Sequence, residues 1–512
     1  MEEGAIKKTW LFLVILGFLV LSLAGVSYGW QGRMAGMDDP FGLVDDESDF
    51  LIHPAKIAKV EKLNFYSNYR FDFRDVPDWN YSVDYIDTTT RSLMAYLPYN
   101  SSGDERGHEI TLGAALPWGP GKMGFFFQYK GNRNDYDGDR VVQSPIYIPS
   151  DTRFGMKDDL DSIALRILYG IPVAGFDLGG EVQLAYYNEK KETRISDHES
   201  GAYYLNLPIG GGGNFYNLFP FMRPYDSKYW EAVFKSSLER GFGPAKFTFT
   251  LGGGVIFSGS NSLMFGDVNL PETGGVNFDG NVKGWNIGGD LWVRYSLQED
   301  VSLPFLLRIK YQTKTRDGDG FGIGSFAGEA SHYSNRENDF QLEVGGGIER
   351  KLLKDIKFAG GIYYVFSKNR NNFLFRLFSA PGLEILDQTK YPDQVEHQVI
   401  IRLAGEKELS PMVTIRSGLE FFYGRVTKDY ESPWGWPETE SVDGPHWGMK
   451  VSVGGTVRFE KFSVEPFLGV GYQKWNLDGT GSISALNVLG NFTRMNEERK
   501  EWFTGGGFSV KF

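Results

Sequence analysis

The chain has 512 residues, no cysteine, 65 glycines and 79 aromatic residues (12 Trp, 27 Tyr and 40 Phe). Without cysteine there is no disulfide scaffold, thiolate metal site, covalently attached haem or cysteine nucleophile. The aromatic content excludes a disordered chain, and the single long apolar run excludes a helical transporter. The net charge of -12 offers no broad basic surface, so we expect no nucleic-acid partner. High Gly and aromatic content favours one large β structure with many turns.

Residues 1–29 are predicted to be a secretory signal peptide. Lys7 and Lys8 precede the apolar stretch 10–24, and small residues follow up to Gly29. This order of basic, apolar and small residues is typical of an export signal. A membrane anchor is the alternative, but the apolar stretch is short for a helical span. We therefore expect export and a mature chain of residues 30–512.

The start of the mature chain carries a distinctive pattern. The run MAGMDDPFGLVDDESD (34–49), which includes Asp45 and Asp46, is followed by HPAKIA (53–58). It resembles the opening of FadL-type outer-membrane transporters of hydrophobic compounds and of their PorV-type relatives. Those proteins have a Gly-Met-Gly-like turn, an acidic pair and then Asn-Pro-Ala-Gly-Leu-Ala. In the second of these motifs, His53 here stands in place of the Asn, and Lys56 in place of the Gly.

This resemblance implies a barrel of fourteen strands with a plug inside it. The plug would be residues 30–59, with Asp45, Asp46, His53 and Pro54 among its residues. The resemblance also implies passage of fatty acids or aromatic hydrocarbons through an opening in the barrel wall. The alternative for 30–59 is a short helical segment that merely closes the periplasmic end.

From position 60 onward, apolar and polar residues alternate over long segments. Val301, Leu303 and Phe305 occupy one parity, whereas Arg308 and Lys310 occupy the other. Successive side chains of a strand point to opposite faces, so one face is apolar and the other polar or small. Segments of more than ten residues that end in Trp or Tyr are typical of lipid-facing strands around a wet interior. Strands of a soluble sandwich are usually shorter.

Short connections alternate with long ones, as in outer-membrane barrels. We therefore predict an all-β fold for residues 60–512: a transmembrane antiparallel up-and-down β-barrel of about sixteen strands, with fourteen or eighteen as alternatives. The segment 76–106 is interpreted as an extracellular excursion, because one more spanning strand would give an odd total. The predicted strands are 60–75, 107–117, 122–131, 159–171, 175–190, 228–241, 245–257, 282–298, 301–315, 337–351, 355–369, 394–407, 411–427, 446–459, 461–475 and 500–512.

The last strand resembles the terminal signal that the barrel-assembly machinery reads in Gram-negative outer-membrane proteins. Trp502, Phe508, Val510 and the terminal Phe512 occupy one parity. This pattern implies the assembly machinery as a partner. It also implies that outer-membrane lipid and lipopolysaccharide surround the barrel.

The inward parity carries more basic than acidic residues, although the chain as a whole is acidic. The candidate lumen residues are Arg294, Arg308, Lys310, Arg402, Arg416, Arg458, Glu420 and Glu465. One interpretation is an anion-preferring constriction, because rings of charge set pore selectivity. The other is a ladder of interior salt bridges, for example between Arg416 and Glu420, Glu465 or another neighbour.

The predicted function is that of a channel or passive transporter of the outer membrane, FadL-like for hydrophobic small molecules. Two alternatives are a water-filled porin with a mildly anion-preferring lumen, and a structural barrel that sheathes a periplasmic electron-transfer or secretion partner. We expect no enzyme activity and no cofactor, because the six histidines show no paired metal-binding spacing and no Gly-x-Ser-x-Gly elbow occurs. The position of residues 30–59 and 205–225, inside the lumen or outside it, distinguishes a plugged route from an open porin.

Overall fold

The computed structural model describes residues 47–87, 93–142, 150–197, 204–205, 215–216, 222–266, 275–323, 330–379, 383–390, 393–430, 439–483 and 489–511. The predicted signal peptide, Asp45, Asp46, Phe512 and most of 205–221 lie outside these residues. In the part of the chain that is described, no helix is both long and apolar enough to cross a membrane.

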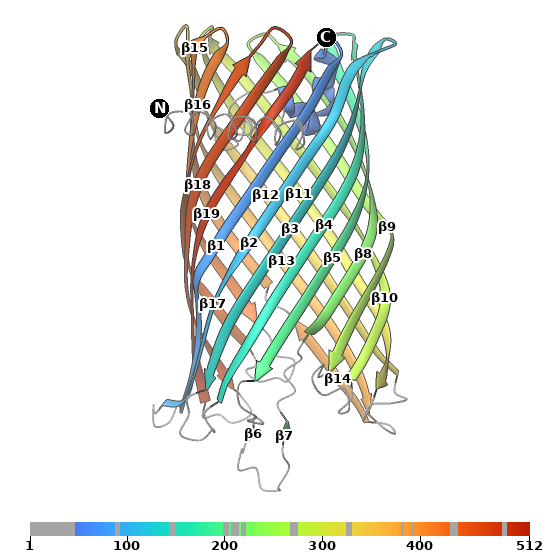
Figure 1. Ribbon diagram of the computed structural model, residues 1–512, viewed down its shortest axis with the longest axis vertical. Coiled ribbons are helices and arrows are strands. Elements are labelled where there is room, and N and C mark those ends of the chain that lie inside the picture. The colour runs from blue at the N-terminus through green and yellow to red at the C-terminus, as the bar shows by residue number, and fades with distance from the viewer. Residues whose placement is uncertain are drawn as a thin grey trace, which may run out of the picture.

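The described chain folds into one closed barrel (Figure 1). The main sheet contains 17 strands, but β14 pairs only with the far end of β13, so sixteen strands form the wall. Neighbours are antiparallel and follow chain order, and β1 pairs with β19 to close the ring. The prediction of sixteen strands is confirmed, and the fourteen implied by the FadL-type resemblance is wrong for this chain.

The wall strands are β1(Asn64–Asp87), β2(Leu93–Trp118), β3(Gly121–Val142), β4(Ser150–Val173), β5(Phe176–Asp197), β8(Met222–Phe242), β9(Ala245–Gly266), β10(Gly275–Gln298), β11(Val301–Ile323), β12(Ala330–Leu353), β13(Ile356–Ser379), β15(Asp393–Ser410), β16(Val413–Tyr430), β17(Thr439–Arg458), β18(Phe462–Ile483) and β19(Leu489–Lys511). Three further short strands are β6(Tyr204–Leu205), β7(Phe215–Tyr216) and β14(Leu383–Lys390), and two 3-10 helices, η1(Glu47–Leu51) and η2(Pro54–Lys59), precede β1.

The strands extend well beyond their predicted ends. They contain 18 to 26 residues, whereas about 9–11 tilted residues suffice to cross a bilayer. The segment 76–106 leaves the predicted membrane region as expected, but much of it is the paired ends of β1 and β2, with Asn80 opposite Asn100. Outside a membrane the outer face of a strand meets water instead of lipid, so the apolar alternation that marks a strand in the sequence is weakened.

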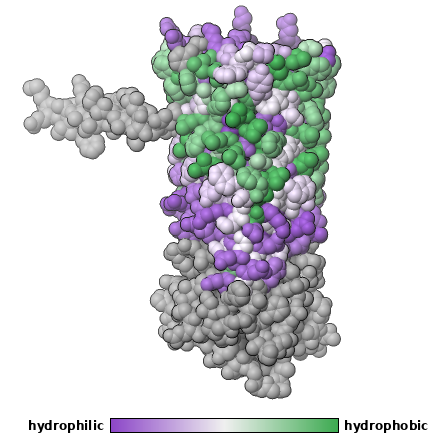
Figure 2. All heavy atoms as spheres, turned by 90° about the vertical axis from the view of Figure 1, so that its right-hand side faces the viewer, coloured by the Kyte–Doolittle hydropathy of each residue, from purple (hydrophilic) through white to green (hydrophobic). Residues whose placement is uncertain are grey.

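The outer surface carries an apolar belt nearer the short-turn end, with hydrophilic residues beyond it (Figure 2). Aromatic pairs border the belt on both sides, for example Tyr186 with Trp230 at the far side and Phe242 with Phe247 beside a short turn. Trp230 and Phe242 lie on one strand, and the residues between them span about 29 Å at ~3.4 Å per residue and a tilt of ~45°. This matches a hydrocarbon layer bounded by two aromatic girdles.

We expect a charged side chain to be tolerated on the lumen face of a belt strand and to be destabilising on its outer, lipid-facing side. Val182 points outward at the middle of the belt on β5 and is 49% exposed, whereas Gln183 lines the lumen. Val182→Arg should lower the free energy of unfolding by about 2–4 kcal/mol, because a cation at the bilayer midplane is poorly solvated. Gln183→Arg is the matched control and should change it little. Urea unfolding in lipid vesicles measures both, and equal effects would contradict the assigned orientation.

Candidate functional site

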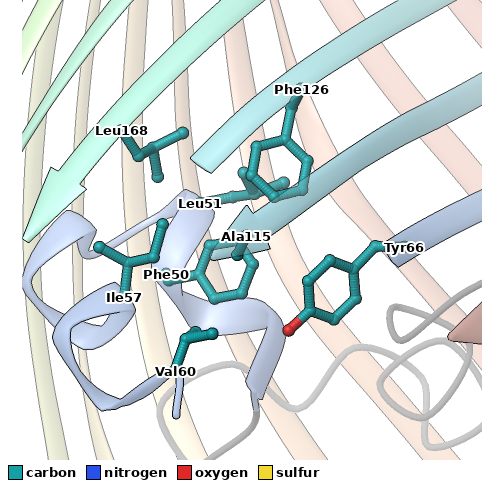
Figure 3. Close-up of a cluster of buried hydrophobic side chains, with 8 residues drawn as sticks. All are labelled: Phe50, Leu51, Ile57, Val60, Tyr66, Ala115, Phe126 and Leu168. Atoms are coloured by element: carbon teal, nitrogen blue, oxygen red, sulfur yellow. The ribbon is translucent and has the colours of Figure 1, made fainter. Parts of the chain in front are cut away.

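Residues 49–60 lie inside the barrel at the short-turn end. Phe50 packs with its ring centroid 5.7 Å from that of Tyr66 on β1 and 5.4 Å from that of Phe126 on β3 (Figure 3). The buried cluster around it comprises Phe50, Leu51, Ile57, Val60, Tyr66, Ala115, Phe126 and Leu168. Burial of these side chains stabilises the segment against the wall, since each large apolar side chain contributes about 1.5–3 kcal/mol. We call residues 49–60 the inner segment.

Two facing glycines make room for the inner segment. Gly170 on β4 and Gly179 on β5 are register partners. A Cβ at Gly170 would lie 2.6 Å from Cγ2 of Ile57, and a Cβ at Gly179 would overlap the backbone of Pro54 and Ala55. Because real Cβ atoms do not approach other atoms so closely, only glycine at these positions lets η2 lie against the wall.

Polar contacts fasten the inner segment to several strands. Nδ1 of His53 lies 2.6 Å from Oγ1 of Thr250 on β9, and the His53 ring meets Trp292 edge-on at 4.2 Å. Further anchors are the hydrogen bond of Ala55 N to Ser237 Oγ, the ion pair of Lys59 with Glu239, and the hydrogen bond that Arg166 donates to Leu51 O at 2.6 Å. His53 and Pro54, two of the predicted plug residues, are buried. Whether the segment acts as a plug remains a proposal.

A cavity of about 550 Å³ lies in the lumen along β1–β5. Its wall includes Gln128, two residues beyond Phe126 on β3, so the cavity begins where the inner segment ends. Small side chains such as Ala164 and Ala185 widen the lumen here, and Leu160 adds an apolar surface. Several polar residues of the lining are paired with one another, as Lys130 is with Glu109 at 3.1 Å. The volume is within the range of small-molecule sites, roughly 300–1,000 Å³.

Three of the predicted lumen residues form one ladder of ion pairs with Asp290 and Glu343, and the five residues of the ladder come from five strands. Arg308 contacts Asp290 at 2.6 Å and Glu343 at 3.0 Å. Arg402 contacts Glu343 at 3.5 Å and Glu420 at 2.8 Å. Lys310 is the next inward residue beyond Arg308 and is exposed. Charges of opposite sign therefore alternate around this part of the wall, which supports the interpretation as salt bridges over that as an anion-preferring constriction.

The remaining predicted lumen residues have separate partners nearer the short turns. Arg294 pairs with Glu349, and Arg416 pairs at 2.7 Å with Glu406, not with Glu420 or Glu465. Arg458 donates to Thr414 Oγ1 at 3.5 Å, and Glu465 accepts a hydrogen bond from Thr456 at 3.0 Å. The structure thus places three of the eight predicted residues in one ladder and four in local contacts, and Lys310 lies beside the ladder.

A second charged network, beyond the far girdle, was not predicted. Glu189 on β5 accepts hydrogen bonds from Tyr229 at 2.8 Å, Lys314 at 2.9 Å and Arg316 at 2.7 Å. Arg316 also pairs with Glu337 on β12. Burial alone would raise the pKa of Glu189, but the two cations hold it down to about 2. The predicted strands ended at 190 and 315, so the inward orientation of Arg316 gave no signal in the sequence.

The described residues of the predicted assembly signal lie on the outer face of β19. Trp502 is 41% exposed, and its ring lies 5.1 Å from that of Phe71 on β1. Phe508 contacts Phe462 with ring centroids 6.0 Å apart, and Val510 is paired with Phe65 in register. These side chains make the apolar belt continuous where β19 pairs with β1. Their recognition by the assembly machinery remains a prediction.

The described part of the chain contains no group of three or more His, Asp or Glu side chains that could hold a metal ion.

Comparisons with known proteins return only loose structural overlaps. No protein-family model and no curated protein matches the chain. A Pseudomonas aeruginosa FadL homologue overlaps with 10% identity and a TM-score of 0.43, over 95% of this chain and 99% of its own. The Ralstonia pickettii toluene transporter TbuX overlaps with 11% identity and a TM-score of 0.39, over 94% of this chain and 98% of its own. The P. putida toluene transporter TodX overlaps with 9% identity and a TM-score of 0.37, over 95% of this chain and 99% of its own. The fold described above rests on the register of the strands and not on these overlaps.

Proposed function

We propose that this protein is an outer-membrane channel that admits small hydrophobic or amphiphilic molecules passively, in the manner of a FadL-type transporter. The observation that carries the proposal is the inner segment, held inside the lumen next to a cavity of about 550 Å³. The apolar belt and girdles support a location in a membrane, and closed barrels with short turns at one end are typical of the outer membrane. An open porin is less well supported, because a porin needs an unobstructed lumen.

Uptake by porin-deficient Gram-negative cells that produce the protein tests the proposal. We expect faster uptake of a long-chain fatty acid and of toluene, the solute after which TodX and TbuX are named as transporters, with little change for arabinose. Faster uptake of arabinose alone would favour the water-filled porin. If no solute enters faster and a periplasmic protein co-purifies with the barrel, the structural sheath replaces the channel as the better interpretation.

A further inference from the structure

Two strands that are not neighbours are joined through the lumen. Glu189 lies on β5 and Lys314 and Arg316 lie on β11, with β8, β9 and β10 between them in the wall. The ion pair of Arg316 with Glu337 continues the connection to β12. We call Glu189, Lys314, Arg316 and Glu337 the crossbar. Side chains on such distant strands meet only where the wall between them bends sharply.

Glycine and a bulge produce this bend. The register of β9 shifts by one residue against both of its neighbours close to Ser258. A β-bulge of this kind increases the local twist and bends the strand. Two glycines lie on β10 beside this bulge of β9. A Cβ at Gly284 would overlap the carbonyl oxygen of Thr313 on β11, and a Cβ at Gly280 would overlap that of Asp317. Glycine at these two positions therefore lets β10 approach β11 closely, so that β11 turns back toward β5.

The crossbar lies at the outer rim of the cavity. Leu160, the register partner of Glu189, lines the cavity, and so does Tyr187, two residues before Glu189. The rings of Tyr187 and Tyr229 are stacked at 4.8 Å. Tyr229 also packs with Ile256 and Val282, so the crossbar rests on a filled, apolar corner of the lumen. Lys314 and Arg316 are buried, whereas the side chains of Glu189 and Glu337 are partly exposed.

We propose that the crossbar narrows the outer mouth of the cavity and selects by charge which solutes enter it. The inference rests on the proposed function as a channel. The crossbar contains two cations and two carboxylates, and these charges sum to zero. Each ionic group that is removed therefore leaves a defined net charge at the mouth. Because charge at a constriction sets ion preference, the sign of the removed group determines the direction of the change.

The experiment measures reversal potentials in planar bilayers under a KCl gradient. All variants carry Gly179→Leu, which displaces the inner segment, so that the inner closure does not limit current. Glu189→Gln and Glu337→Gln should each shift the permeability ratio toward chloride, by about twofold or more. Lys314→Gln and Arg316→Gln should shift it toward potassium by a similar factor. Glu189→Gln combined with Arg316→Gln should raise conductance and leave the ratio near that of the parent.

The matched control is Arg425→Gln. Arg425 pairs with Asp443 and is 70% exposed on the outer surface, away from the lumen, so its removal should leave the ratio unchanged. A purely structural crossbar would give shifts that do not sort by the sign of the removed charge, and that result overturns the inference. If the Gly179→Leu parent itself shows no current, the proposed channel function fails instead. Heat-modifiable migration on gels confirms that each barrel is folded.

Discussion

Replacing Gly179 with leucine will open the inner end of the lumen. A side chain at this position overlaps the backbone of Pro54 and Ala55, and β5 cannot move away because β4 and β8 hold it by hydrogen bonds along its length. The inner segment must therefore leave the wall. We expect single-channel conductance in planar bilayers to rise by about tenfold or more over the unchanged protein, since the lumen then lacks its inner closure.

Gly180→Leu is the matched control for this variant. Gly180 has the opposite parity on β5, and its nearest neighbour to an added Cβ would be the carbonyl oxygen of Lys235 at 3.8 Å. That substitution places an apolar side chain on the belt and should leave the conductance unchanged. Equal conductance in both variants and in the parent would show that the inner segment does not close the lumen, and the channel proposal would lose its main support.

Replacing Arg402 with alanine will destabilise the barrel by about 3–5 kcal/mol. Its guanidinium contacts Glu343 and Glu420 and lies over the ring of Tyr363 at 4.8 Å, and the side chain is 16% exposed. Removal leaves Glu420 without its arginine partner in a place with little water. Urea unfolding in lipid vesicles measures the loss.

A double variant separates this effect from lost packing. Arg402→Met with Glu420→Gln keeps much of the side-chain volume and removes the stranded charge, while Glu343 keeps its pair with Arg308. We expect most of the stability to return. If Arg402→Ala is instead as stable as the parent and shifts ion preference strongly toward cations, the residue belongs to a selectivity constriction and the salt-bridge interpretation is wrong.

Within the membrane belt, the sequence alone was sufficient to assign the faces of the strands. Val182 and Gln183 differ in parity, and the structure places one on the apolar belt and the other on the lumen. The physical reason is that lipid on one side and water on the other impose a strict alternation. The same alternation gave the number of strands, because every short turn falls between two alternating segments.

Beyond the belt this signal disappears. The sequence placed Arg316 in a loop, whereas β11 continues to Ile323. The outer face of the distal strands meets water instead of lipid, so polar residues are acceptable at either parity. The partner of Arg416 was also undetermined, because Glu406, Glu420 and Glu465 all point inward and only the register of β15 against β16 selects Glu406.

The sequence by itself determined that this protein is a membrane barrel with a separate segment ahead of its first strand, because composition and two-residue periodicity are local properties. Only the tertiary structure decided where that segment lies and how the lumen is narrowed. His53 meets Thr250 across 197 positions, and Glu189 meets Arg316 across 127. Contacts over such separations depend on barrel closure, register and the bend at Gly280 and Gly284, and no local pattern encodes them.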